Sequence, residues 1–212
     1  MSKLKVAISA PIDDNLYSLL LAKACLNEFG VDLVAFVTLR TWSIKRVLME
    51  IDKSGIKLIK RVWRKYFTSK KSQSRSTIIK KGFLNTPKIG VFNVHMGILP
   101  KYRGIGVTEW PILEASESAA PLLGVTLHIM DTGVDSGPII EEKRIMLDSG
   151  DEIHDLDQKY LPEMVRLMIS GVKKARDGIL ELTQQKSEDG KQYFMLHDRM
   201  KEIASKKIKK YV

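Results

Sequence analysis

The order of apolar segments in residues 3–38 is the feature that most restricts the fold of this chain. Residues 3–10 have the composition of a short buried strand, and residues 31–38 form a second run rich in β-branched residues. Between them, apolar side chains cover most of a helix surface over 15–29, and Gly30 ends that helix. A strand, a helix and a second strand joined by tight turns are typical of a parallel α/β sheet. We therefore predict an α/β fold in which helices flank a mostly parallel sheet.

The alternation of strands and helices continues along the rest of the chain. A polar and basic loop is predicted over 68–77, and residues 100–104 are also predicted to form a loop. We find no internal repeats. The further predicted elements are helices over 42–53, 107–115 and 151–185 (with breaks near Pro162 and Gly171), strands over 89–95, 122–130 and 139–146, and a solvated basic helix over 201–211.

Cysteine content and hydropathy exclude several classes of protein. Cys25 is the single cysteine, which excludes an intramolecular disulfide framework and a cysteine-based zinc cluster, and its apolar helix predicts a buried thiol. No apolar run reaches the roughly 20 residues that a membrane span needs, and the first apolar run is too short for a secretory signal. We therefore expect a soluble, cytoplasmic protein with a single core.

Positive charge is concentrated in one segment of the chain. The formal net charge is +10, and residues 53–108 contain 14 Lys and Arg but no Asp or Glu. The rest of the chain has 21 basic residues against all 25 acidic ones, so this segment carries the whole excess. Two explanations fit this excess equally well. The segment is either a solvated basic surface, or a docking surface for an anionic substrate, a nucleic acid or an acidic membrane.

Polar side chains at a predicted strand end suggest a reactive site. Asn93 and His95 lie two residues apart at the end of the 89–95 strand, so they point to the same side. The loop after the 122–130 strand carries Asp131 and Asp135, and either is expected to reach the same edge. An amide, an imidazole and a carboxylate together can stabilise an oxyanion and move a proton. The alternative is that His95 is an ordinary structural histidine.

The other histidines suggest no metal site. His128 alternates with apolar residues in a predicted strand and is most simply a core or cleft-wall residue, whereas His154 and His197 lie among charged residues. No two histidines have the i, i+4 spacing of helical zinc ligands, so we predict no metal.

Four motifs occurring in order resemble the core of the folate-dependent formyltransferases. This resemblance covers about residues 86–144 and is specific because several separate motifs agree in order and spacing. It implies the Rossmann-like formyltransferase fold of that family, with a catalytic domain over 1–150 and a helical extension over 151–212 packed on it. The motifs are Asn93–His95, Leu99–Gly104, Gly124–His128 and Asp131–Ile140.

The resemblance also implies which residues act in the reaction. The family's catalytic Asn-His-Asp set falls on Asn93, His95 and Asp135, which favours Asp135 over Asp131. The co-substrate would be 10-formyltetrahydrofolate, whose formyl carbon is attacked by an amine, with no metal taking part. The resemblance assigns substrate contacts to Lys101, Tyr102, Arg103, Gly104 and Glu109, and folate contacts to Leu84, Gly133 and Val134.

Features outside the motifs indicate the branch of the family. Only 68 residues follow Arg144 and they have a helical pattern, so we expect no C-terminal barrel domain of the methionyl-tRNA enzymes. Residues 10–15 lack glycine and carry two acids, unlike the phosphate loop of the glycinamide ribonucleotide enzymes. We therefore expect a member of the sugar-nucleotide branch or of a less characterised formyltransferase-like group. The favoured acceptor is a small anionic substrate, an amino-sugar nucleotide, whose negative charge would suit the basic segment. A homodimer is compatible with the sequence.

One departure from the family pattern leaves alternatives open. The family has a hydrophobic strand before the segment matched by 79–84, whereas residues 67–77 here have no strand pattern, since 68–77 are polar and basic. A missing stretch, a shortened homologue with a rebuilt sheet, and a catalytically impaired protein that binds folate or a sugar nucleotide would each account for this. A basic nucleic-acid-binding module is a further alternative, which the aromatic content of 7% disfavours.

Overall fold

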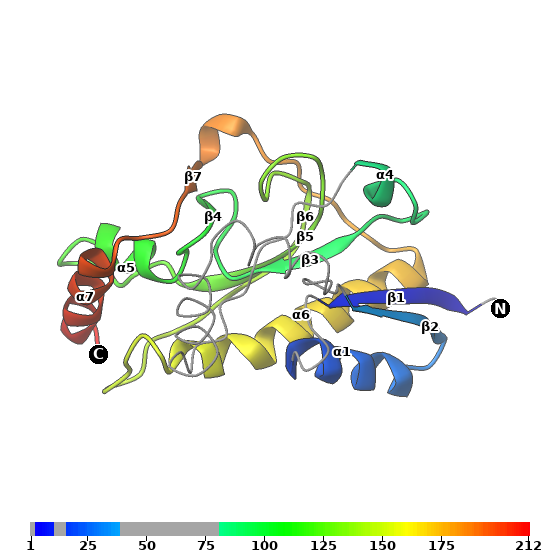
Figure 1. The fold of residues 1–212 in the computed structure, drawn as a ribbon, viewed down its shortest axis with the longest axis horizontal. Helices are drawn as coiled ribbons and strands as arrows, with labels where there is room; N and C mark the ends of the chain where they lie inside the picture. Colours follow the sequence, from blue (N-terminus) through cyan, green and yellow to red (C-terminus); the bar gives the residue numbers. More distant parts are fainter. Residues whose placement is uncertain (1–2, 11–15, 39–80) are drawn as a thin grey trace, which may run out of the picture.

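A computed structural model describes residues 3–10, 16–38 and 81–212 of the chain (Figure 1). The first unit is the predicted strand–helix–strand unit. Strand β1 (Leu4–Ala10) pairs in parallel with β2 (Val31–Thr38), and helix α1 (Leu16–Asn27) comes between them in the chain. Leu21 and Cys25 of α1 are buried in the core, so the prediction of a buried thiol is confirmed, and burial raises the pKa of that thiol.

A second sheet contains the strands that the motifs predicted. Its order is β3 (Phe92–His95), β5 (Gly124–Ile129) and β6 (Ile139–Arg144). Both pairings are antiparallel, although the fold as a whole is the predicted α/β arrangement, with β1 and β2 in parallel. The short 130–138 connection explains the reversal between β5 and β6, because a parallel crossover needs about a dozen residues or more.

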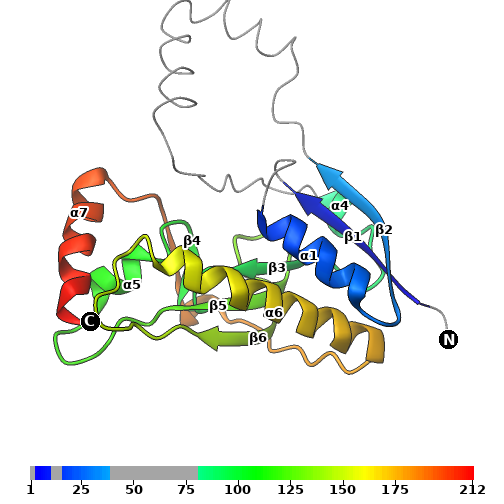
Figure 2. The ribbon, with the colours of Figure 1, turned by 90° about the horizontal axis from the view of Figure 1, so that it is seen from below.

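Helix α6 (Leu156–Asp177) runs along the second sheet and also contacts α1, which connects the two units (Figure 2). It continues through Pro162 and Gly171, so the predicted breaks do not occur. Gly171 is needed for close packing, since a Cβ atom there would lie 2.4 Å from Cδ2 of Leu127. The helix ends at Gly178, whose φ of 71° suits glycine. Residues 178–186 are not helical, in contrast to the helix predicted as far as 185.

The C-terminal part contains strand and helix in contact with the motif region. Strand β4 (Tyr102–Gly104) pairs in parallel with β7 (Lys191–Tyr193), so the loop predicted over 100–104 contains a strand. Local sequence could not show this pairing because the partner is distant in the chain. The remaining elements are α4 (Lys81–Leu84), α5 (Glu109–Glu114), the 3-10 turn η1 (Ser187–Asp189), α7 (Asp198–Lys207) and the 3-10 turn η2 (Ile208–Lys210).

The basic C-terminal helix is partly buried. Ala204 of α7 and Ile208 of η2 are fully buried, and α7 packs against α5. The Lys207 ammonium donates to the carbonyls of Leu113 and Ala115, at 2.7 Å each. The predicted solvated helix is therefore partly buried, because Ala204 and Ile208 face a neighbour, whereas Ile203 is 50% exposed.

The predicted helix over 42–53, the loop over 68–77 and most of the basic segment lie outside the described residues. Within the described part of the chain, no helix combines the length and apolar character needed to cross a membrane.

Candidate functional site

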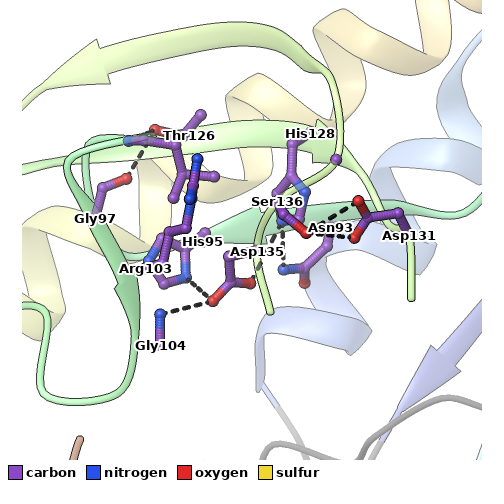
Figure 3. A network of polar contacts seen from close by, with 12 residues as sticks. Asn93, His95, Gly97, Arg103, Gly104, Thr126, His128, Asp131, Asp135 and Ser136 are labelled. Carbon is purple, nitrogen blue, oxygen red and sulfur yellow. Dashed lines mark hydrogen bonds and ion pairs between the residues drawn. The ribbon is translucent and has the colours of Figure 1, made fainter. Parts of the chain in front are cut away.

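Strands β3 and β5 bring four polar side chains to one face of their sheet. In the antiparallel register, Asn93 lies opposite His128 and His95 lies opposite Thr126. Directly opposed residues share a face, and so do residues two apart in a strand. The predicted alignment of Asn93 with His95 is therefore present, and β5 adds two polar residues to it (Figure 3).

Asp135 completes this group from the 130–138 loop. One carboxylate oxygen, Oδ2, accepts a 2.9 Å hydrogen bond from the Gly104 amide and lies 3.4 Å from Nδ1 of His95. The other oxygen, Oδ1, lies 3.6 Å from Nε2 of His128. Asp131 instead bonds within its own loop, to the Gly133 amide and the Ser136 hydroxyl (Figure 3). Of the two aspartates left open by spacing, Asp135 reaches the cluster.

The backbone at Asp135 is in an uncommon conformation. Its φ of 50° lies in the left-handed region, which L residues other than Asn and Asp rarely adopt. The Gln185 side chain holds this backbone by donating to the carbonyls of Asp135 and Gly137, at 3.0 and 2.6 Å. Gln185 lies in a segment that the sequence predicted as helix, so no local signal pointed to this contact.

His95 is buried, and both of its ring nitrogens face acceptors. Nε2 lies 2.8 Å from the Tyr102 carbonyl, while Nδ1 faces Asp135. A carbonyl only accepts, so Nε2 carries a hydrogen, and Nδ1 is the ring nitrogen that faces the Asp135 carboxylate. Gly97 leaves room for the ring, since a Cβ atom there would lie 2.8 Å from Nε2 of His95.

His128 is more deeply buried than His95, with 1% of its surface exposed. Nε2 lies 3.1 Å from Nδ2 of Asn93, and Nδ1 lies 3.2 Å from the Ile129 carbonyl. Burial lowers the pKa of His128, against the opposing attraction of Asp135. The sequence predicted a core or cleft-wall residue here, and the register with Asn93 is what places it in the polar group.

Thr126 supports the loop that follows β3. Its hydroxyl donates to the Gly97 carbonyl at 2.7 Å and accepts from the Leu99 amide at 3.1 Å. The Thr126 side chain is fully buried, so these bonds satisfy groups that have little access to water. This contact fixes the path of the chain from His95 to Tyr102.

The predicted substrate-binding residues occupy different environments. Lys101 is exposed, and its ammonium lies 5.5 Å from the centroid of the Tyr102 ring. Tyr102 is 2% exposed, and burial raises the pKa of its phenol. Glu109 is half-buried in the first turn of α5. Gly104 meets Asp135 through its backbone amide.

Arg103 is held by the C-terminal segment. It is 8% exposed, and its Nε donates to Oε1 of Gln185 at 3.1 Å while Nη2 donates to the Lys186 carbonyl at 2.9 Å. Because Gln185 also binds the Asp135 backbone, Arg103 and Asp135 share one support. Arg103 therefore has a structural role, in which it binds the C-terminal segment, in addition to the predicted contact with an anionic substrate.

The predicted folate-binding residues lie near the Asp135 loop and in α4. Gly133 and Val134 directly precede Asp135, and the Val134 side chain is 43% exposed. A Cβ atom at position 133 would lie 2.0 Å from Oγ of Ser136, so a side chain there would displace this hydroxyl. Leu84 is half-buried at the end of α4. Among the residues that the structure describes, no group of three or more His, Cys, Asp or Glu side chains is placed to hold a metal ion.

Sequence comparison identifies a family model that spans the four motifs, and relatives that match part of the chain. Residues 74–172 match the family model described as formyl transferase. Over 124 residues the chain is 35% identical to the methionyl-tRNA formyltransferase of Thermodesulfovibrio yellowstonii, and over 112 residues it is 35% identical to that of Agathobacter rectalis. These matches cover 54% and 53% of this chain but only 39% and 35% of those relatives, so the chain spans well under half of their length.

Structural comparison extends the similarity to most of the chain. An N-formyltransferase from Helicobacter canadensis, solved with folinic acid and dTDP-3-aminofucose, is 25% identical with a TM-score of 0.59. That match covers 91% of this chain and 71% of the other. The phosphoribosylglycinamide formyltransferase of Anaplasma phagocytophilum shares the fold at 18% identity, with a TM-score of 0.60 over 91% of this chain and 100% of its own. The resemblance read from the motifs is confirmed.

Proposed function

We propose that this chain, whose residues 74–172 match the formyl transferase family, moves a formyl group from 10-formyltetrahydrofolate to the amino group of a small anionic substrate, an amino-sugar nucleotide. One observation carries the proposal. The fold gathers Asn93, His95 and Asp135, which come from separate motifs, into a single group within hydrogen-bond or ion-pair distance of one another or of a shared neighbour. An amide donor, an imidazole and a carboxylate are the groups that acyl transfer to an amine requires.

Transfer forms a carbon–nitrogen bond to the acceptor amine and breaks the bond to the donor nitrogen, which gains the proton that the amine loses. The folate supplies the activated formyl group. The Nδ2 atom of Asn93 donates one hydrogen to Nε2 of His128. Its other hydrogen is available to the formyl oxygen, which gains negative charge as the amine adds. A donor fixed in a half-buried position stabilises this charge more than water does.

His95 handles the proton through Nδ1. Its Nε2 is already committed to the Tyr102 carbonyl, so Nδ1 is the nitrogen that can accept a proton from the amine. Asp135 lies 3.4 Å from Nδ1 and stabilises the resulting imidazolium. The Gly104 amide and the Gln185 side chain hold Asp135 in place, through its carboxylate and its backbone respectively.

The folate is expected to lie beside Val134. An apolar side chain that is 43% exposed directly before Asp135 offers a surface for a flat ring next to the reactive group. Leu84 and Gly133 are the other residues that we assign to this role. The role of each of these residues, like the division at residue 150, stays a prediction.

The choice of acceptor has two kinds of support. The relative from Helicobacter canadensis was solved with a nucleotide-linked amino sugar and matches most of this chain. Lys101 is also exposed near the site and is free to meet a negatively charged group. A second acceptor, methionyl-tRNA, is favoured by the 35% identity to methionyl-tRNA formyltransferases. The two acceptors share the formyl-transfer chemistry and differ in what binds beside Lys101.

The test is release of tetrahydrofolate by the purified chain. We expect release with 10-formyltetrahydrofolate and dTDP- or UDP-linked amino sugars, and none with the matched hydroxy sugars, which lack the nucleophilic nitrogen. Formylation of methionyl-tRNA alone would overturn the assignment of a sugar acceptor. No release with amino sugars, methionyl-tRNA or glycinamide ribonucleotide, together with calorimetric binding of folate, would overturn transfer and support a binding protein.

A further inference from the structure

His128 is a buried titratable group that formyl transfer does not directly require. It is 1% exposed, and its Nε2 contacts the amide of Asn93, the proposed oxyanion donor, and lies 3.6 Å from Oδ1 of Asp135. Buried polar side chains that are fully hydrogen-bonded restrict their neighbours to one arrangement.

The partners of His128 determine where its hydrogens lie. Nδ1 faces the Ile129 carbonyl at 3.2 Å, and a carbonyl only accepts, so Nδ1 carries a hydrogen. Nε2 faces the Asn93 amide nitrogen at 3.1 Å, which only donates, so Nε2 offers its lone pair. The contacts therefore describe the neutral ring with its hydrogen on Nδ1.

We infer that His128 is a positioning residue, whose neutral ring holds the Asn93 amide with its NH2 group turned to the site. The expected effect of His128 on the reaction rate rests on the proposed function, whereas the hydrogen-bond arrangement does not. One amide hydrogen is given to His128, and the other is left in a fixed direction for the formyl oxygen. A freely turning amide would present its carbonyl oxygen part of the time, which repels an oxyanion.

Protonation of His128 breaks this arrangement. A hydrogen on Nε2 would point at the hydrogens of the Asn93 NH2 group, so the present contact would be lost. Either Nε2 would then donate to Oδ1 of Asp135, which lies 3.6 Å away, or the Asn93 amide would rotate to present its oxygen. The charged groups around the ring are Asp135 and Asp131 from the loop, which favour protonation, and His95 from β3, which opposes it. On β6, His128 is paired with the apolar Ile139.

Two substitutions separate this role from simple packing. His128→Gln places a carbonyl oxygen near the position of Nε2 and cannot be protonated, whereas His128→Leu fills similar space without an acceptor. We expect His128→Leu to lower kcat about tenfold or more with little change in KM, since oxyanion donors contribute about 10²–10³-fold when removed outright. His128→Gln should keep kcat within a few-fold of wild type and lose the acid-side fall in kcat that protonation of His128 causes.

Nuclear magnetic resonance of the histidine-labelled full chain gives a readout that needs no activity. Long-range nitrogen–proton correlations distinguish the two neutral tautomers and the imidazolium, and His128→Gln identifies the signals. We expect a neutral ring with its hydrogen on Nδ1 at pH 7. A hydrogen on Nε2 would overturn the inference even if the enzyme were active. Equal kcat for the Gln and Leu variants, both folded by circular dichroism, would also overturn it, whereas inactivity of the wild type would count only against formyl transfer.

Discussion

The β1–α1–β2 unit and the β3–β5–β6 sheet bury different kinds of side chain. In the first, the described core residues are mostly apolar, such as Ile8, Leu21 and Val31. In the second, β3 and β5 bury His95, Thr126 and His128 next to fully buried apolar residues of β5. Burying a polar group costs free energy unless a partner satisfies it, so these residues have a use beyond packing. The difference predicts that substitutions in the first unit change stability alone, whereas those at the buried polar residues of the second sheet also affect the site.

The largest effect is expected from His95→Ala. Loss of a general acid or base commonly costs about 10²–10⁴-fold in rate, because the proton then has no acceptor at the right position. Tetrahydrofolate release at saturating substrates measures this loss. Urea denaturation of the same variant should show that it remains folded. Unchanged activity would remove His95 from the reaction and weaken the distinction between the two regions.

Leu21→Ala tests the other side of the comparison. Leu21 is 6% exposed in the core beneath α1, and Leu→Ala changes in cores cost about 2–5 kcal/mol of unfolding free energy. Urea denaturation measures this cost, with the exposed Leu26→Ala of the same helix as the matched control. Activity per folded molecule should equal that of wild type. A selective loss of kcat in the Leu21 variant would show that the first unit also shapes the site.

Thr126→Val measures how much the buried hydroxyl stabilises the second sheet. The change leaves the Leu99 amide and the Gly97 carbonyl without their partner, and an unsatisfied buried group costs about 1–3 kcal/mol. Thr126→Ser keeps the hydroxyl and loses one methyl group, at about 0.8 kcal/mol. Unfolding by urea should therefore rank Val below Ser in stability. The reverse order would show that packing, and not hydrogen bonding, governs this position.

The smallest effect is a pH dependence of stability from His128. Burial lowers the pKa of this ring below its ordinary value of 6.5, so near and below that pH the unfolded chain binds more protons than the folded one. The stabilisation from His128 is therefore present above about pH 6.5 and is lost as the pH falls. Urea titrations at pH 7.5 and 5.5 should show a smaller acid loss for His128→Gln than for wild type. Equal losses would show that the ring has an ordinary pKa.

Local patterns were sufficient for the first unit and for the main strands of the second. The predicted 31–38 strand has the bounds of β2, and the predicted helix over 15–29 contains α1. Two failures have a common cause, because they depended on distant partners. Strand β4 exists through pairing with β7, and α6 passes Pro162 and Gly171 while packed against the sheet. Tertiary contacts outweigh local propensity in such places.

The sequence by itself determined the α/β class and the joint projection of Asn93 and His95, because both follow from periodicity along one chain segment. The motifs that resemble the formyltransferases already favoured Asp135 over Asp131, but only the tertiary structure shows how Asp135 meets His95 and that His128 meets Asn93. Those contacts join residues from different strands and a loop, whose distances depend on register and on the left-handed turn at Asp135. The same holds for Gln185, which reaches Asp135 and Arg103 from the far end of the chain.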